Sequence, residues 1–453
     1  MHNIILNSDS YKYSQFNQYP ANTTGIYSYI ESRGGKYDET VFFGLQAFIK
    51  EYLTAPITQD MIDEAELIIT AHGEPFNRAG WEYILNEHNG YLPVRIRAVP
   101  EGTIVPVKNV LATIENTDPA CYWLTSFLET ALLRAIWYPT TVATNSREIK
   151  KLILDALEKT GDPTTIDFKL HDFGARGVSS LESAGIGGAA HLVNFMGTDT
   201  VEALLFARRY YNADMAGFSI PAMEHSTVTS WGRENEVASY RNMIKQNAKP
   251  GGLIACVSDS YDIFAACEKW GTELKQDVID SGATVVIRPD SGDPATVVNE
   301  CLAILDKNFG HTVNEKGFKV LNNVRVLQGD GITIQSIRSI IFTITMSGYS
   351  VDNVAFGQGG ALLQIVNRDD QKFAMKCSAA LVNGEWVDVF KDPITDAGKQ
   401  SKKGRVTLYN NGQGNLFSDV INKDYPDELV TVFENGKIVK EYTFDEVRVN
   451  SNK

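Results

Sequence analysis

One pattern recurs through the middle of this chain and limits what it can fold into: an apolar run ends in polar residues, and a segment of helical periodicity follows. The runs end at seven places, namely His171 to Gly177, Gly197 to Asp199, Glu224-His225, Ser258-Asp259, Arg288 to Asp290, Gly329 to Gly331 and Gly357 to Gly360. The ends recur about every 30 residues, the length of a strand plus a crossover helix, which predicts parallel strands wound into a barrel. Seven ends suggest a barrel that is incomplete or irregular, with its polar groups gathered at one common mouth.

The two ends of the chain follow a different pattern. Val94, Ile96 and Ala98 alternate with two arginines, which predicts an antiparallel strand, and a helical stretch is expected at residues 46–53. After about residue 370, β-rich runs are separated by turn signals, each of type I′: Asn383-Gly384, Asn410-Asn411-Gly412 and Asn435-Gly436.

The sequence therefore predicts an α/β protein with two domains. An irregular (β/α) barrel is expected over residues 141–370, and a second, β-rich domain is expected to be built from both chain ends, residues 1–140 and 371–453.

The first βα unit illustrates the repeating pattern. Apolar spacing predicts a helix over 146–160 that stops at Gly161, and the alternation over 166–170 predicts the strand that follows. Ser179 and Glu182 have the spacing of a capping box for a helix that runs to about residue 193.

Composition narrows the function classes. The five cysteines lack paired metal spacing and are odd in number, which argues against a disulfide framework and indicates a reducing compartment. The chain start has no basic and apolar leader pattern, and no long apolar run is present, so a soluble cytoplasmic protein is expected. A net charge of -14 disfavours non-specific nucleic-acid binding, so any phosphate ligand needs a local cluster of cations.

His225 is the candidate reactive centre. It follows the apolar run 218–223 and the carboxylate Glu224, and a flanking carboxylate can orient an imidazole or raise its basicity. The alternative is that His225 caps the following helix or packs in the core.

Two glycine clusters that lead into helices, at 329–331 and 357–360, have the composition of phosphate sites. Tight βα turns also favour glycine, so each cluster alone is weak evidence. Asp290 and Asp330 could accept hydrogen bonds from ribose hydroxyls. The alternative for Asp290, Asp259 and Asp199 is helix capping.

The candidate cations fall into two groups. Arg176, Arg288 and Arg368 lie beside strand ends, whereas Arg33, Lys376, Lys391 and Lys399 lie outside the predicted barrel. The alternative for the basic run 399–405 is a solvated face. Phe173 could stack on a flat ring, or belong to the core.

These residues resemble a known family in both identity and order. The motifs are Asp9-Ser10-Tyr11-Lys12, Cys121-Tyr122-Trp123-Leu124, HDFGARGVSS at 171–180, Gly197-Thr198-Asp199-Thr200, Glu224-His225-Ser226, SDSYD at 258–262, IRPDSG at 287–292, QGDG at 328–331 and Phe390-Lys391-Asp392-Pro393. Over residues 3–448 the chain is similar to the nicotinamide phosphoribosyltransferases. The resemblance implies an irregular α/β barrel joined to a β-rich domain, and a homodimer with active sites at the interface.

The resemblance also implies a reaction: nicotinamide and phosphoribosyl pyrophosphate give nicotinamide mononucleotide and pyrophosphate in NAD salvage. It implies Mg²⁺ on the pyrophosphate, with no metal ligands assigned, and ATP hydrolysis coupled through a phosphohistidine at His225 that Glu224 polarises. The alternatives are a nicotinate phosphoribosyltransferase and a nucleotide-binding sensor without turnover.

The implied site residues, carried over motif by motif, have two kinds of role. The catalytic set is His225, Glu224 and Asp290. Phe173 and Tyr11 of the partner subunit would sandwich the nicotinamide ring, and Asp199 would bind its carboxamide. The remaining implied substrate contacts are Arg176, Asp259, Arg288, Pro289, Gly329, Asp330, Gly359, Gly360 and Arg368, with Arg33, Lys376, Lys391 and Lys399 reaching across the dimer.

The sequence departs from the vertebrate pattern of this family in three places. The loop after Arg33 is short, Ala255 stands where a serine faces the amide, and Gln358 replaces a serine in a glycine turn. Amide binding is therefore expected to depend more on Asp199.

Overall fold

A computed structural model of the protein describes residues 3–395, 400–421 and 424–453. The chain forms two compact units. The first comprises Met1–Thr144, Ala207–Ala213 and Asn367–Lys453, and the second comprises Asn145–Phe206 and Asp214–Val366.

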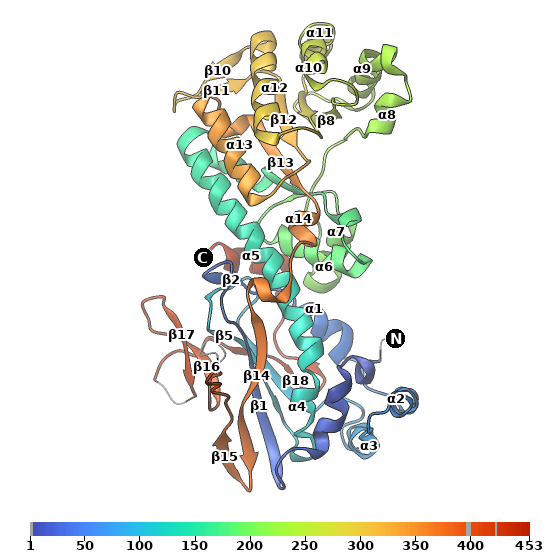
Figure 1. Cartoon of the computed structure of the whole chain (residues 1–453), viewed down its shortest axis with the longest axis vertical. Helices are drawn as coiled ribbons and strands as arrows, with labels where there is room; N and C mark the ends of the chain where they lie inside the picture. The colour runs from blue at the N-terminus through green and yellow to red at the C-terminus, as the bar shows by residue number, and fades with distance from the viewer. Residues whose placement is uncertain (1–2, 396–399, 422–423) are drawn as a thin grey trace. The chain divides into compact units, whose positions relative to one another are not determined.

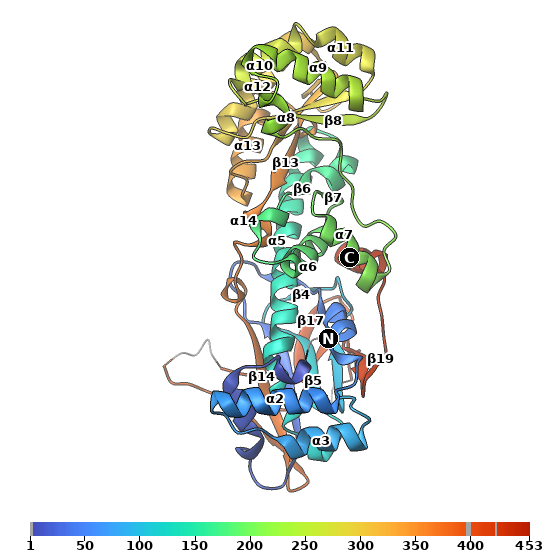
Figure 2. The ribbon, with the colours of Figure 1, turned by 90° about the vertical axis from the view of Figure 1, so that its right-hand side faces the viewer.

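The first unit combines a large antiparallel sheet with helices. Its strands are β1 (Thr23–Ser32), β2 (Glu39–Val41), β3 (Val94–Ala98), β4 (Ile104–Pro106), β5 (Val110–Asn116), β14 (Phe373–Val382), β15 (Glu385–Asp388), β16 (Val406–Asn410), β17 (Leu416–Val420), β18 (Val430–Glu434) and β19 (Lys437–Ile438). Its helices are η1 (Ile4–Leu6), η2 (Ser10–Asn17), α1 (Leu45–Phe48), η3 (Ile49–Leu53), α2 (Gln59–His72), α3 (Arg78–Glu87), η4 (Pro119–Cys121), α4 (Leu124–Phe127), η9 (Arg368–Asp370) and α15 (Phe444–Ser451). Figure 2 shows α2 and α3 side by side.

Seven strands of the first unit form one sheet in the order β15-β14-β1-β5-β3-β18-β19. In Figure 1, β1 lies against β14, which follows it by more than 300 residues in sequence, and the pair is antiparallel from Thr23↔Val382 to Ser32↔Phe373. The expectation that the last part of the chain completes a sheet begun by the first part is therefore confirmed.

Two of the three predicted turns are confirmed as type I′. Asn383 and Gly384 have φ of 51° and 83°, and Asn435 and Gly436 have φ of 49° and 80°, the double positive φ that this turn requires. The prediction for 410–412 is wrong in turn type, although β16 and β17 do form a hairpin. The last pair is Asn410↔Leu416, and positive φ falls at Gly412 and Gly414, so the loop is longer.

The second unit holds the parallel sheet. Its strands are β6 (Leu170–Asp172), β7 (Gly197–Thr198), β8 (Leu253–Val257), β9 (Thr284–Arg288), β10 (His311–Val313), β11 (Lys319–Leu321), β12 (Val324–Gln328) and β13 (Val354–Gln358). Its helices are η5 (Pro163–Phe168), η6 (Ala175–Gly177), α6 (Leu181–Leu192), α8 (His225–Thr229), η7 (Arg233–Asn235), α9 (Glu236–Asn247), α10 (Ile263–Gly271), α11 (Lys275–Ser281), α12 (Pro294–Phe309), α13 (Ile334–Met346), η8 (Val351–Asn353) and α14 (Gly360–Leu363). Two further helices, α5 (Glu129–Thr160) and α7 (Val201–Tyr211), contribute residues to both units.

The parallel strands have the order β7-β6-β13-β12-β9-β8, and residues 218–222 bridge the two outer strands. Phe218 pairs in parallel with Gly197, and Ala222 pairs in parallel with Ala255. The expected irregular barrel is confirmed, because its seventh member is an extended segment held by isolated bridges. Apolar side chains on the strands and on helices such as α10, α12 and α13 form its buried core.

Three local predictions need correction. The helix predicted over 146–160 begins at Glu129 and includes Pro139, because burial of neighbours such as Ile136 and Ala143 outweighs the missing N–H group. Residues 163–168 form a 3₁₀ helix rather than a strand, since Asp162 accepts a hydrogen bond from the Thr164 N–H and Pro163 starts the turn.

The third correction concerns the start of α6. Ser180, and not Ser179, caps this helix: its backbone is extended and its hydroxyl accepts from the Ser183 N–H. A one-residue displacement of this kind is common where two serines adjoin a helix start.

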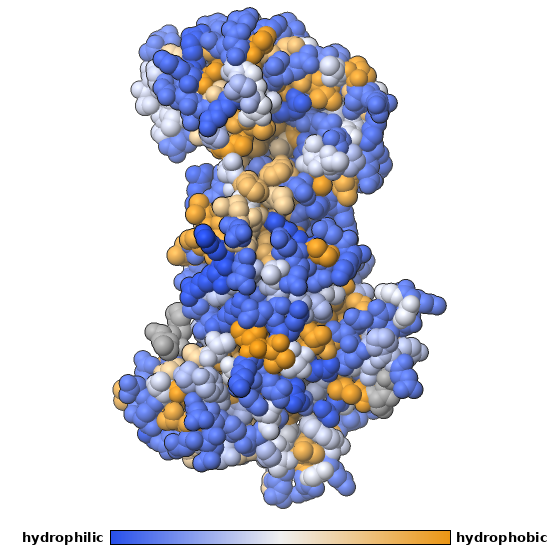
Figure 3. Space-filling view, turned by 180° about the vertical axis from the view of Figure 1, so that it is seen from behind, coloured by the Kyte–Doolittle hydropathy of each residue, from blue (hydrophilic) through white to orange (hydrophobic). Residues whose placement is uncertain are grey.

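The surface and the thiols complete the description. The face in Figure 3 is mostly hydrophilic with separate hydrophobic patches. Among the described residues, no helix combines the length and apolar character needed to cross a membrane. All five cysteines are free thiols, four of them buried.

Candidate active site

The carboxyl ends of the parallel strands in the second unit bring most of the predicted residues to one rim. Ordered by the strand that each follows, they are Phe173 and Arg176 after β6, Asp199 after β7, Asp259 after β8, Pro289 and Asp290 after Arg288 of β9, Gly329 and Asp330 after β12, and Gly359 and Gly360 after β13. Hydrogen bonds join adjacent ends: the Asp290 N–H donates to Asp259 Oδ2 (3.0 Å), and the Phe173 N–H donates to the Gln358 carbonyl (3.0 Å).

His225 begins α8, follows the bridging segment, and is 46% exposed. Its Nε2 lies 3.7 Å from Asp259 Oδ1 and 3.6 Å from Asp290 Oδ2, and its Nδ1 lies 3.1 Å from Ser260 Oγ. With the proton on Nε2, the ring N–H faces the two carboxylates, and Nδ1 accepts from the Ser260 hydroxyl.

The expectation that Glu224 orients the His225 ring needs correction. The Glu224 carboxylate instead accepts a hydrogen bond from Ser226 Oγ, and the carboxylates that face the ring are Asp259 and Asp290. The reason is the helix start: Glu224 occupies the N-cap position of α8 with an extended backbone, and adjacent side chains at a helix start diverge.

The capping alternative fails for both carboxylates near His225. The caps of the helices that follow β8 and β9 are Asp262 and Asp293, whose side chains accept from helix N–H groups. Asp259 instead accepts from the Asp290 N–H and from Ser291 Oγ through its Oδ2, while its Oδ1 faces His225.

Asp259 and Arg288 carry buried polar atoms that point to a ligand. Asp259 Oδ1 and Arg288 Nε have no hydrogen-bond partner among the described residues. Buried polar groups are normally paired, so an exception at a rim of this kind fits a bound ion or substrate. Carboxylate oxygens of Asp259 and Asp290 suit a hard cation such as Mg²⁺, and the Arg288 guanidinium suits phosphate.

Phe173 lies on a shelf of backbone made by two glycines. A Cβ on Gly357 would lie 2.0 Å from Phe173 Cε2, and one on Gly329 would lie 3.5 Å from the same atom. The Phe173 side chain is half-buried, so part of its ring remains available for stacking on a flat ligand.

Asp199 is exposed, and its Oδ1 accepts a hydrogen bond from Ser219 Oγ (2.6 Å). Ser219 belongs to the bridging segment, and the sequence reasoning missed it because the pairing depends on barrel closure. It also missed Asp172, which is buried between Phe173 and Asp199; its place inside the motif 171–174 was the available signal.

The two glycine clusters differ as anion sites. At α13 the Thr333 hydroxyl accepts from the Ser336 N–H and the Ser336 hydroxyl accepts from the Thr333 N–H, so two of the expected free donors are already used. At α14 no side chain caps the helix, and a Cβ on Gly360 would meet no atom within 4 Å. The 359–360 turn is therefore the more open of the two.

Other predicted cations belong to the first unit. Arg33 pairs with Glu31 at 3.3 Å, and the pKa of Lys376 is lowered chiefly by burial, with Arg33, Lys391 and Lys12 contributing positive charge. Tyr11 is 55% exposed, and the Lys12 ammonium lies 5.1 Å from its ring centroid. Arg368 is exposed beside Asp369, and Lys399 lies outside the described residues.

Comparison with known proteins identifies the family. A model of the "Nicotinate phosphoribosyltransferase (NAPRTase) family" matches residues 168–437, and a model of the "Nicotinamide phosphoribosyltransferase, N-terminal domain" matches residues 3–96. A nicotinamide phosphoribosyltransferase of Xanthomonas campestris pv. campestris (strain 8004) is 58% identical over 460 residues, which cover 99% of this chain and 98% of the relative. The chain belongs to the nicotinamide phosphoribosyltransferase family.

One further relative supports this family, and two solved structures share its fold. A nicotinamide phosphoribosyltransferase of Acinetobacter baylyi (strain ATCC 33305 / BD413 / ADP1) is 33% identical and covers 97% of this chain and 95% of the relative. The crystal structure of a nicotinate-nucleotide pyrophosphorylase from Pyrococcus furiosus has a TM-score of 0.64 at 17% identity, covering 99% of this chain and 94% of that chain. Human nicotinic acid phosphoribosyltransferase has a TM-score of 0.57 at 14% identity, with 99% and 93% covered, so both structures share the fold.

Two of the residues that depart from the vertebrate pattern of the family, Ala255 and Gln358, lie in the barrel. Ala255 on β8 is buried. Its N–H donates to the Pro221 carbonyl in the bridging segment, and its carbonyl accepts from the N–H of Met223, the residue after that segment. Gln358 is buried at the end of β13, and its carbonyl accepts from the Phe173 N–H. Their backbone groups thus hold the rim together.

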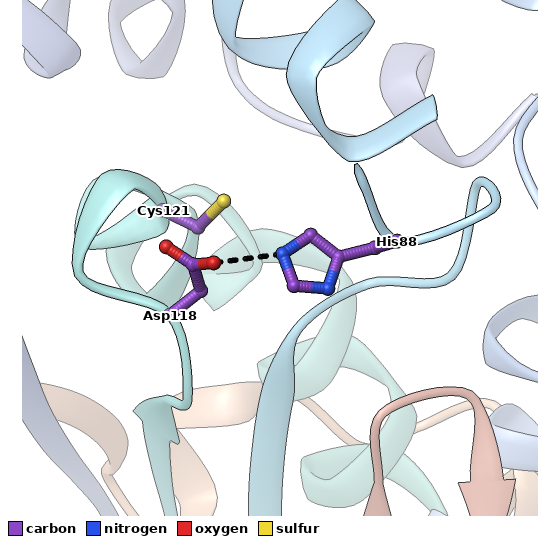
Figure 4. Close-up of side chains that lie close together, drawn as sticks. All are labelled: His88, Asp118 and Cys121. Atoms are coloured by element: carbon purple, nitrogen blue, oxygen red, sulfur yellow. Dashed lines mark hydrogen bonds and ion pairs between the residues drawn. The ribbon is translucent and has the colours of Figure 1, made fainter. Parts of the chain in front are cut away.

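A second cluster of metal-ligand types lies in the first unit, where His88 and Asp118 face each other beside Cys121 (Figure 4). His88 Nε2 is 2.9 Å from Asp118 Oδ2, while Asp118 Oδ1 caps η4 by accepting from the Ala120 N–H. Burial raises the pKa of the Cys121 thiol to about 12. A hydrogen bond and a helix cap thus account for these contacts.

Proposed function

We propose that this protein transfers a phosphoribosyl group from phosphoribosyl pyrophosphate to nicotinamide, giving nicotinamide mononucleotide and pyrophosphate. The proposal rests on two sets of residues at the strand ends of one barrel. The first set is Phe173 and Asp199, and the second is His225 with Asp259 and Asp290. The first set suits a flat amide, and the second suits a metal-bound, phosphorylated sugar.

In the proposed reaction the pyridine nitrogen of nicotinamide attacks the anomeric carbon of the ribose. The bond from that carbon to the pyrophosphate oxygen breaks, and the bonding electrons leave with pyrophosphate. Because the transition state resembles an oxocarbenium ion, the protein's task is to align the ring and stabilise the departing charge.

The phosphate contacts are proposed from donor chemistry. Arg288, with its unpaired buried Nε, and the open Gly359-Gly360 turn would hold phosphate oxygens, while Asp290 and Asp330 would accept from ribose hydroxyls. Asp259 and Asp290 would hold Mg²⁺, which would neutralise pyrophosphate charge when bound.

His225 is proposed to couple ATP hydrolysis to this transfer. The unprotonated ring nitrogen of His225 would attack the γ-phosphorus of ATP. The bond to the bridging oxygen would break, ADP would leave, and water would later release phosphate from the ring.

A homodimer with shared sites is also part of the proposal. The exposed ring of Tyr11 and the cations Arg33, Lys376 and Lys391 belong to the first unit, and they would serve the barrel of a second copy. Tyr11 of the partner subunit would cover the face of nicotinamide opposite Phe173.

The test is product formation by purified protein with phosphoribosyl pyrophosphate and Mg²⁺, with mass detection of the nucleotide. Nicotinamide and nicotinate are offered in parallel reactions. Nicotinamide mononucleotide as the main product supports the proposal; nicotinate mononucleotide as the main product would favour the alternative enzyme, and no nucleotide from either base would favour a sensor.

A further inference from the structure

Asp172 is the last residue of β6 and joins the two residues proposed to bind the base. Its backbone carbonyl accepts from the Asp199 N–H (2.9 Å), and Phe173 follows it directly in the chain. Its Oδ1 accepts from the Gly174 N–H (2.7 Å), which fixes the turn that carries Phe173. Its Oδ2 accepts from Thr198 Oγ1 (3.4 Å), next to Asp199.

The Asp172 carboxylate is enclosed. The residue is 0% exposed, and a Cβ on Gly188 of α6 would lie 3.0 Å from Oδ2, while a Cβ on Gly174 would lie 3.0 Å from Oδ1. Backbone therefore lies close to both carboxylate oxygens, and a longer side chain would not fit without displacing it.

The charge of Asp172 is unusual for a buried group. Burial raises its pKa to about 6, with Asp199 adding to the increase, so the carboxylate is mostly ionised at neutral pH. In the part of the chain that the structure describes, no cation forms an ion pair with it. A buried, unpaired carboxylate costs stability, and such groups cluster at functional sites.

We propose that Asp172 is a positioning and selectivity residue, which locks Phe173 and Asp199 to each other and places a second negative charge behind Asp199. This inference rests on the proposed binding of nicotinamide by those two residues. The second charge strengthens the preference for a neutral carboxamide, because the carboxylate of nicotinate would then meet two like charges in a partly desolvated site.

The first test is Asp172→Asn, which keeps an acceptor for the Gly174 N–H and removes the charge. The ratio of kcat/KM for nicotinamide to that for nicotinate is expected to fall about tenfold, mostly through KM, as a lost charge interaction of this kind predicts. An unchanged ratio would overturn the selectivity role. Failure of the proposed function itself is distinguishable, because the unmutated protein would then form no nicotinamide nucleotide.

Thermal stability separates this role from a purely structural one. If the buried charge destabilises the folded protein, Asp172→Asn should melt at a higher temperature than the unmutated protein at pH 7.5. A lower melting temperature, or a variant that does not fold, would show that the carboxylate serves the fold instead. Asp155→Asn is the matched control, since Asp155 is an exposed carboxylate paired with Lys159, and both measurements should stay unchanged.

A pair of variants at Thr198 tests the positioning half independently of the charge. Thr198→Val removes the hydroxyl that donates to Asp172 and accepts from the Thr200 N–H, whereas Thr198→Ser retains both contacts. KM should rise severalfold for both bases in the first variant and stay near the unmutated value in the second. Equal KM values in the two variants would overturn the positioning role.

Discussion

Gly357 on β13 gives the most direct test of the aromatic shelf, through the substitution Gly357→Ala. The new Cβ would lie 2.0 Å from Cε2, 2.3 Å from Cδ2 and 2.8 Å from Cζ of Phe173. Ordinary carbon contacts begin at about 3.5 Å, so the ring has to move by roughly 1.5 Å. The backbone at Gly357 does not need positive φ, so the effect comes from the ring rather than from strain.

A displacement of that size should damage the reaction severely. Misplacing a reacting group by about 1 Å can cost on the order of 100-fold, so kcat/KM for nicotinamide should fall by at least about that factor. Steady-state kinetics with varied nicotinamide measures it. At Gly329, by contrast, a Cβ would meet Asp290 Oδ1 at 3.4 Å and Phe173 Cε2 at 3.5 Å, both ordinary contacts, so Gly329→Ala should not displace the ring.

A double-mutant cycle shows whether the loss passes through the ring. In Phe173→Ala the ring is absent, so adding Gly357→Ala should cost little more, and the two losses should be far from additive. Additive losses, or a Gly357→Ala variant with an unchanged KM for nicotinamide, would refute the claim that the backbone at Gly357 positions the Phe173 ring.

Four further outcomes are expected. Asp199→Ser should narrow the preference for nicotinamide over nicotinate, measured as the kcat/KM ratio, since it removes the carboxylate that is proposed to accept from the amide and to repel nicotinate. Equal use of both bases by the unmutated protein would contradict this. Heterodimers of Tyr11→Ala and Phe173→Ala subunits should regain part of the activity through one intact site, and verified heterodimers without recovery would argue against shared sites. His225→Ala should lose ATP hydrolysis and the acid-labile phosphate label but keep some ATP-independent transfer; label on another residue would remove the nucleophile role. Burial raises the pKa of Asp172 to about 6 in the folded protein, above its ordinary value of 3.8, so the folded state binds more protons than the unfolded state between these values. As pH rises from about 4 to 7.5, the unfolding free energy of the unmutated protein should therefore fall by up to about 3 kcal/mol relative to that of Asp172→Asn. Denaturant unfolding at several pH values measures both free energies, and a constant difference between the two proteins across that range would contradict the prediction.

The sequence by itself determined the repeating architecture and most of the rim. Apolar runs that end in polar residues set the parallel strands, and Asn-Gly pairs with positive φ set two of the hairpins. These features depend on interactions within a few residues, which a local pattern records. For the same reason the motif order was enough to place the chain in its family.

Only the tertiary structure decided which side chains meet. Glu224 adjoins His225 in sequence, yet the carboxylates that face the ring come from two other strand ends, at 259 and 290. Ser219 reaches Asp199 because the bridging segment closes the barrel, and Pro139 lies inside a helix because that helix is buried. Such pairings depend on strand order and burial, which are properties of the whole fold rather than of any short stretch of the chain.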